Sequence, residues 1–425
     1  VKNLIQFIDH SPSCFHVIEN AKKQFLEHGF IQLEEKEHWN LEEGKSYFVE
    51  RNGSSMIAFH LPKKDFQGFH IVASHSDSPT YRIKEQPEMS VEKHYTKLNI
   101  ERYGGMIPET WFDRPLSVAG RIIIEENGQI KDQLVNIDRD LMIIPNLAIH
   151  MSRSSNESKQ LNPQKDLLPL CGGNLTKDGF EEMIAKESGV EKEDILSYDL
   201  FLYNRMRGTT LGINEEFVAA PKLDDLECAY SSIEGMLNAK LSKDYVTVCA
   251  VFDNEEVGSG TKQGAGSTFF PEVLKRISYL CGKNEEEYYM AVADSFMLSA
   301  DNAHAVHPNY QDKTDPTNRP YINEGIVLKY NASQKYTTDA NSAALVKYLC
   351  KKEKIKCQVF FNRSDMLGGS TLGNILTGQV SIKAADIGLP QLSMHSTYET
   401  AGCKDLDDMI TLMESFYELG KEVQI

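Results

Sequence analysis

Two short runs of almost wholly apolar residues constrain the fold of this chain more than any other feature. They are FHIVAS at 69–74 and YVTVCAVF at 245–252. A strand buried on both faces has such a continuous run, which is typical of a parallel sheet covered by helices on both sides. We therefore expect both runs to be interior strands of an α/β sheet.

Helix and strand patterns alternate with these runs along the chain. An amphipathic helix pattern covers 1–30, with a Ser-Pro-Ser interruption at 11–13, and a hairpin with an Asn-Gly turn is expected over 46–61. Helix patterns follow at 223–241, 271–281, 339–353 and 405–422, and strand patterns at 288–296, 356–361 and 382–389. This alternation predicts an α/β domain with a mainly parallel sheet and helices on both faces.

Residues 89–216 have a different pattern. The stretch 107–138 alternates with period 2, contains a second Asn-Gly turn and lacks helical periodicity, which predicts antiparallel strands. The simplest division is a catalytic α/β domain formed by 1–88 and 217–425, with a β-rich domain of 89–216 inserted into it.

The charge and the cysteines exclude several classes of protein. With 45 Lys+Arg against 62 Asp+Glu, the net charge of −17 disfavours nucleic acid and anionic membranes as partners. The eight cysteines include no CxxC pair, so we expect reduced thiols and neither a disulfide framework nor a zinc knuckle. The first residues do not resemble a signal peptide, and no run approaches the ~18 apolar residues that span a bilayer. A cytoplasmic protein is expected.

Chemically active residues follow the predicted strands at their carboxyl ends, where open α/β sheets bind ligands. One further acidic residue begins the helix pattern at 223. Together these residues are His75, Asp77, Asp224, Glu255, Glu256, Asp301 and His395. Imidazoles and carboxylates that converge suit Zn²⁺, Mn²⁺ or Co²⁺.

Each element alone also has an ordinary structural explanation. His75 and Asp77 fit a solvated loop, Glu255 and Glu256 fit a charged surface, and Asp224 fits a helix N-cap. Alternatively, Asp77 orients His75 for a metal, and adjacent carboxylates diverge so that one binds metal and the other acts as a general base. No HExxH, GxSxG or P-loop motif competes for the function.

Several longer motifs carry a family resemblance over almost the whole chain. They are HSDSP (75–79), LDDL (223–226), FDNEEVGS (252–259), SADNAHAVHPNY (299–310), RSDMLGGSTLG (363–373), SMHSTYE (393–399) and IPNLAIHMSR (144–153). In this order they resemble the aspartyl aminopeptidase family of dizinc exopeptidases, in its shorter bacterial branch. The resemblance implies a zinc exopeptidase fold with an inserted dimerisation domain.

The resemblance also implies roles for individual residues. Two zinc ions would be bridged by Asp224, one completed by His75 and Asp301 and the other by Glu256 and His395. Glu255 would be the general base and Asp77 would support His75. The remaining implied site residues are His150, which acts in a neighbouring subunit, and Lys329 and His304, which bind substrate. A cis peptide bond between Asp224 and Asp225 and a homododecamer built from dimers are implied as well.

The expected function is removal of an N-terminal residue, preferably acidic, from peptides. An aminopeptidase for neutral residues, a related deacylase and a catalytically silent assembly protein remain alternatives. This chain departs from the family at Asp225, where Asn is common, and at Asn146, where His is common. The first departure adds a carboxylate close to the expected metals.

Overall fold

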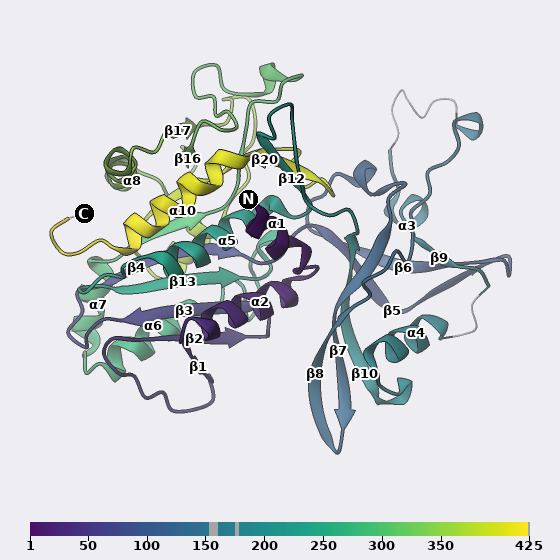
Figure 1. The fold of residues 1–425 in the computed structure, drawn as a ribbon, viewed down its shortest axis with the longest axis horizontal. Helices are drawn as coiled ribbons and strands as arrows, with labels where there is room; N and C mark the ends of the chain where they lie inside the picture. Colours follow the sequence, from purple (N-terminus) through teal and green to yellow (C-terminus); the bar gives the residue numbers. More distant parts are fainter. Residues whose placement is uncertain (153–159, 175–177, 424–425) are drawn as a thin grey trace.

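The computed structural model describes residues 1–152, 160–174 and 178–423, and their strands form three sheets. Figure 1 shows the largest sheet with its helices on the left and the second sheet, drawn in blue and teal, beside it on the right. None of the helices among these residues has the length and apolar character needed to cross a bilayer. All eight cysteines are free thiols, as expected.

The largest sheet has nine strands and is parallel at its centre. In spatial order the strands are β1 (Ile31–Leu33), β2 (Lys45–Arg51), β3 (Ser55–Leu61), β13 (Val246–Phe252), β4 (Phe69–His75), β14 (Phe296–Ala300), β18 (Lys383–Gly388), β16 (Ile326–Lys329) and β17 (Cys357–Phe360). The four central strands, β13, β4, β14 and β18, all run parallel. The hairpin β2–β3 and the pairs β3–β13 and β16–β18 are antiparallel. The prediction of a mainly parallel sheet is confirmed.

Helices cover both faces of this sheet. One hydrophobic cluster contains side chains of α1 (Lys2–Asp9), α2 (Cys14–Glu27), α5 (Leu223–Asn238), α8 (Ala340–Glu353) and α10 (Cys403–Tyr417), and the other contains those of α6 (Phe269–Leu280), α7 (Glu285–Ala293) and α9 (Leu372–Gln379). Along β13, Cys249 and Val251 join the first cluster, whereas Val248 and Ala250 join the second. Successive side chains of a strand point to opposite faces, so burial on both sides requires the unbroken apolar run seen in the sequence.

The predicted strand at 288–296 is wrong. Most of this stretch belongs to helix α7, and the strand β14 begins only at Phe296. Helix α7 starts with a capping box, in which the Asn284 side chain accepts from the Glu287 N–H while the Glu287 side chain accepts from the Asn284 N–H. A short apolar run by itself fits either structure, and the capping box is the local signal for a helix at this position. Helix α9 was not predicted, and α10 ends at Tyr417 rather than 422.

The second sheet is antiparallel throughout. Its strands, in spatial order, are β8 (Gln129–Asn136), β7 (Leu116–Glu126), β10 (Ile195–Asn204), β5 (Thr80–Val91), β6 (Tyr95–Tyr103) and β9 (Leu170–Gly172), and it is accompanied by α3 (Pro163–Asp166) and α4 (Gly179–Ser188). The predicted boundary between residues 88 and 89 falls inside β5, so this sheet begins at Thr80. We call this six-stranded unit the inserted sheet.

A third, five-stranded sheet takes its strands from separate segments of the chain between residues 209 and 402. It consists of β11 (Thr209–Leu211), β12 (Phe217–Ala220), β20 (Glu399–Gly402), β19 (Pro390–Leu392) and β15 (Ala303–His304). It joins the segment that leaves the inserted sheet to the segments that follow β14 and β18. The turn with His395 lies between β19 and β20.

Candidate metal centre

The central parallel strands bring the predicted site residues to one edge of the sheet. Strands β4 and β13 are paired in parallel so that His75 lies opposite Phe252, and Glu255 is the third residue beyond β13. Strand β14 pairs with the other side of β4 and ends at Ala300, immediately before Asp301. Since parallel strands end at the same edge, residues far apart in the sequence meet there.

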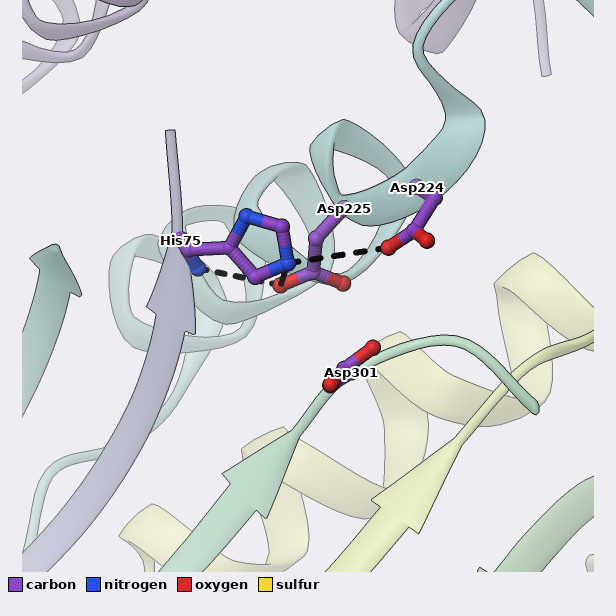
Figure 2. A group of neighbouring side chains, drawn as sticks. All are labelled: His75, Asp224, Asp225 and Asp301. Atoms are coloured by element: carbon purple, nitrogen blue, oxygen red, sulfur yellow. Dashed lines mark hydrogen bonds and ion pairs between the residues drawn. The ribbon is translucent and has the colours of Figure 1, made fainter. Parts of the chain in front are cut away.

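Within the described residues, three groups of side chains place possible ligand atoms within 4.8 Å of one another. They are His75, Asp224, Asp225 and Asp301 (Figure 2); His75, Glu255 and Glu256; and Asp224, Glu256 and His395. All five predicted ligands are thus brought together. Asp224 belongs to two of the groups, and the peptide bond between it and Asp225 is cis, as the resemblance implied.

The two carboxylate oxygens of Asp224 face two different imidazoles. Asp224 Oδ1 lies 3.6 Å from His75 Nε2, and Asp224 Oδ2 lies 3.3 Å from His395 Nε2. His395 Nε2 also lies 3.4 Å from Glu256 Oε1. Asp224 therefore stands between two clusters of ligand atoms.

Asp77 holds both the His75 imidazole and the loop that follows β13. His75 Nδ1 faces the backbone oxygen of Asp77 at 3.1 Å and its Oδ1 at 3.3 Å, which leaves Nε2 for a metal. The Asp77 carboxylate also accepts the backbone N–H groups of Glu255 (3.0 Å) and Glu256 (3.1 Å) at the start of the short 3-10 helix η5 (Glu255–Val257). Asp77 is 3% exposed, so these bonds are shielded from water.

Glu399 is a site residue that the sequence analysis missed. Its buried carboxylate accepts the backbone N–H of Asp224 at 3.0 Å and that of His395 at 2.7 Å, and thereby ties two predicted ligands together. It lies in the SMHSTYE motif, four residues after His395. The glutamate at that position was the available signal.

Asp225, the departure from the family pattern, also takes part. Its buried Oδ2 accepts the His75 backbone N–H at 3.0 Å and lies 3.9 Å from His75 Nε2. Figure 2 shows its carboxylate between His75 and Asp224. Burial raises the pKa of Asp225, and the charges of Asp301 and Asp224 add to this effect. The nearby His75 opposes it without reversing the direction.

The other three predicted site residues occupy different environments. Lys329 is buried at the end of β16, where its Nζ donates to the backbone oxygens of Asp301 (2.7 Å) and Asn302 (3.2 Å). A solvated lysine at a strand edge is thus excluded. His304 lies on β15 and part of its surface is accessible. Desolvation by the protein around its ring, followed by the charge of Lys329, lowers the pKa of His304. His150 is exposed in the 3-10 helix η2 (Ile149–Met151) and belongs to none of the three groups.

The centre contains several buried carboxylates whose charge a bound cation would stabilise. Burial raises the pKa of Glu255 to about 8 and raises the pKa of Glu256 and Asp301. Burial opposes ionisation of Asp224 as well, but the interaction with the facing imidazoles of His395 and His75 outweighs it and lowers the pKa of Asp224. Among the described residues, Asp224 Oδ1, Asp225 Oδ1 and Glu256 Oε1 are buried without a hydrogen-bond partner. Such orphaned carboxylate oxygens beside imidazole nitrogens fit a divalent metal such as zinc.

Comparison with known proteins supports this chemistry. The family described as aminopeptidase I zinc metalloprotease (M18) matches residues 7–417. The chain is 46% identical to a probable M18 family aminopeptidase 2 of Clostridium acetobutylicum, over 98% of each protein. It belongs to the M18 family. The protein is accordingly a zinc-dependent aminopeptidase, a hydrolase of the exopeptidase type.

Solved structures agree with this M18 fold. A chain in the cryo-EM structure of the Ape4 and Nbr1 complex superimposes with a TM-score of 0.95 at 36% identity, covering 98% of this chain and 85% of that one. The S. cerevisiae mApe1 dodecamer gives a TM-score of 0.85 at 27% identity, covering 98% and 95%. The prediction of an M18-like α/β fold is therefore confirmed.

Proposed function

We propose that this M18 aminopeptidase holds two adjacent divalent ions bridged by Asp224. The observation that carries the proposal is the division of the Asp224 oxygens, one towards His75 and the other towards His395. In this assignment Asp301 completes the first position, with Asp225 beside it, and Glu256 completes the second. When bound, the ions would polarise the scissile carbonyl and lower the pKa of a water towards neutrality.

Glu255 is the proposed general base. Glu255 shares one group with His75 and Glu256, but unlike Glu256 it does not also belong to the group with Asp224 and His395, so we assign its carboxylate to the water and that of Glu256 to the metal. Its pKa, raised to about 8 by burial, suits a group that takes up a proton and later returns it. Glu255 would accept the proton of the attacking water and deliver it to the leaving amine.

We propose a preference for an acidic N-terminal side chain. The centre carries many carboxylates, so such a preference requires local positive charge. Lys329 is the proposed source: two of the three N–H groups of its ammonium are taken by the two backbone oxygens, and the ammonium also lies 3.8 Å from Asp301 Oδ2. His304 lies near Lys329 and is accessible from solvent.

A panel of substrates tests this preference. Chromogenic amides of Asp, Glu and Leu are assayed beside an N-acetylated amino acid, with and without chelator. The proposal expects chelator-sensitive hydrolysis of the Asp and Glu amides that is faster than that of the Leu amide. Faster Leu hydrolysis would establish a neutral preference, and cleavage of the N-acetylated compound alone would establish a deacylase.

We propose that the subunits assemble, through the inserted sheet, into a dodecamer in which His150 reaches the centre of a neighbour. His150 is exposed and is flanked by Ile149, 46% exposed, and Met151, 76% exposed. An M18 relative that superimposes on the chain is a dodecamer. In this arrangement His150 would stabilise the negative charge that develops on the substrate oxygen.

Replacement of Glu255 tests the catalytic proposal directly. Glu255→Gln keeps the size of the side chain and removes the base, so kcat should fall at least ~10²-fold while zinc content and the melting temperature stay unchanged. Exposed Glu37 offers a matched control, since Glu37→Gln should leave kcat unaltered. Turnover of Glu255→Gln close to that of the unmodified enzyme would remove Glu255 from the role.

A further inference from the structure

One side chain of the inserted sheet reaches the catalytic loop. Tyr103 is the last residue of β6, and its hydroxyl donates to Asp77 Oδ2 at 2.7 Å. The same hydroxyl accepts from Asn254 Nδ2 at 2.9 Å. Tyr103 therefore connects the inserted sheet to the two segments that follow β4 and β13.

The two partners of Tyr103 hold the loop that carries the proposed base. Asp77 accepts the backbone N–H groups of Glu255 and Glu256 through both of its oxygens. Asn254 precedes Glu255, and its side-chain oxygen accepts from Thr261 Oγ1 and from Gln263 Nε2, each at 2.7 Å. The Tyr103 hydroxyl thus belongs to one hydrogen-bond network that holds both Glu255 and Glu256, where the loop begins, and Thr261 and Gln263, where it ends.

The residues after Tyr103 approach the same loop closely. Gly104 has φ +77°, and a Cβ added to it would lie 3.1 Å from Glu256 Cβ. A little further on, the Ile107 N–H donates to the His395 backbone oxygen at 3.0 Å. The segment 103–107 is therefore packed against the loop and bonded to the turn of His395, independently of the Tyr103 hydroxyl.

We propose that Tyr103 is a positioning residue for the reaction: its hydroxyl orients Asp77 and Asn254 and so sets the place of the Glu255 carboxylate. The inserted sheet then contributes to catalysis within its own subunit, in addition to any role in assembly. This inference rests on the proposed role of Glu255.

The expected effect of losing the hydroxyl follows from geometry. Asp77 Oδ2 would keep only the Glu256 N–H of its two donors, and Asn254 Nδ2 would lose its bond to Tyr103, so the loop would be free to tilt. Displacement of a catalytic group by about 1 Å costs up to ~10²-fold in rate. Ground-state binding of substrate does not depend on the base, so KM should change little.

The test compares two Tyr→Phe variants that each remove only a hydroxyl. Tyr103→Phe should lower kcat by ~10-fold or more, with KM within ~2-fold and zinc content unchanged. Tyr203→Phe is the control, because Tyr103 and Tyr203 both line one cavity of about 250 Å³, whereas the Tyr203 hydroxyl bonds Asn136 and Ile137. Its kcat should stay within ~2-fold. Assays at saturating zinc, with melting temperatures, separate positioning from loss of metal or of fold.

A double-mutant cycle shows whether Tyr103 acts through Asp77. In an Asp77→Asn background, Tyr103→Phe should cause less than ~2-fold further loss in kcat, since the orientation of Asp77 is already disturbed. Unchanged kcat in Tyr103→Phe, an equal loss in Tyr203→Phe, a loss that follows the melting temperature, or additive losses in the cycle would each overturn the inference. An active Glu255→Gln enzyme would instead overturn the proposed function itself.

Discussion

At the scale of single residues, the centre depends on carboxylates that hold backbone groups as well as on those that face a metal. Asp77 accepts two N–H groups of the Glu255 loop, and Glu399 accepts those of Asp224 and His395. These bonds preorganise the ligands, because a buried carboxylate with several N–H partners has little freedom to move. Replacement of ligands and of supporting residues should therefore have different effects on metal content.

Removal of a ligand should lower bound zinc. Asp224→Ala and His395→Ala each delete a side chain from the Asp224, Glu256 and His395 group, so dialysed protein should contain less metal by elemental analysis. His60→Ala is the control, because His60 bonds Ser46 and lies outside all three groups. Retention of two metals per chain in both ligand variants would refute the ligand assignment.

Zinc affinity should rise with pH. Burial raises the pKa of Glu256, and the bond to Asp224, outweighing burial, raises the pKa of His395, so both groups of the metal-free protein hold protons above their ordinary pKa values. Zinc binds the deprotonated forms and must expel these protons, hence affinity falls as pH falls. Zinc added to metal-free protein in weak buffer at pH 7 should release protons, and His395→Ala should release fewer. Equal affinity at pH 6 and pH 8 would contradict this prediction.

At the scale of elements, the site exists because buried parallel strands end at one edge. Strands β4, β13 and β14 are buried along their whole length, with side chains in the clusters on both faces of the sheet. Such strands cannot shift by one residue without exchanging the side chains of the two faces. Their register therefore fixes where His75, Glu255 and Asp301 emerge. Helix α7, which leads into β14, depends on its own start signal.

Loss of the α7 cap should destabilise the protein measurably. Asn284→Ala removes the acceptor for the Glu287 N–H and should lower the free energy of unfolding by ~1 kcal/mol. Asn284→Asp keeps an acceptor at the same position and should remain within ~0.5 kcal/mol of the unmodified protein. Denaturant unfolding followed by circular dichroism compares the two variants. An Asn284→Ala protein as stable as Asn284→Asp would assign the start of α7 to packing alone.

At the scale of the whole molecule, the inserted sheet and the loops between its strands have two proposed tasks. Towards its own subunit it presents Tyr103 and the segment that follows to the catalytic loop. Towards solvent it presents His150 with exposed apolar neighbours. A site that needs both Tyr103 of its own subunit and His150 of a neighbour would be active only in the assembly.

Subunit mixing tests the proposed sharing of sites. His150→Ala should assemble normally yet lose activity, and mixing it with Glu255→Gln should restore part of the activity. Some sites would then combine an intact Glu255 with a neighbour's intact His150. Mass photometry and light scattering verify assembly and exchange. No recovery after verified exchange would count against sharing, and a fully active monomer at assay dilution would exclude it.

The sequence by itself determined the parts that depend on local pattern. Continuous apolar runs specify interior strands because both faces of such strands are buried, and active residues directly after these runs must reach the same edge. On this basis His75, Glu255, Glu256, Asp301 and His395 were expected at one edge of the sheet, with Asp224 at the start of a helix, and the structure brings these residues together. Their individual roles came from the family resemblance alone. Helix α7 was missed because a short apolar run suits either structure and its cap was overlooked.

Only the tertiary structure decided which groups support the site. Glu399 bonds the Asp224 backbone across 175 residues of sequence, and Tyr103 bonds Asn254 across 151. No periodicity connects such positions, since their contact depends on how β20 and the inserted sheet pack against the catalytic domain. The division of the Asp224 oxygens between His75 and His395 is likewise a matter of tertiary geometry. A sequence specifies which ligand and hydrogen-bonding groups exist. The direction in which each group points is set by the packing of the helix, strand or loop that carries it.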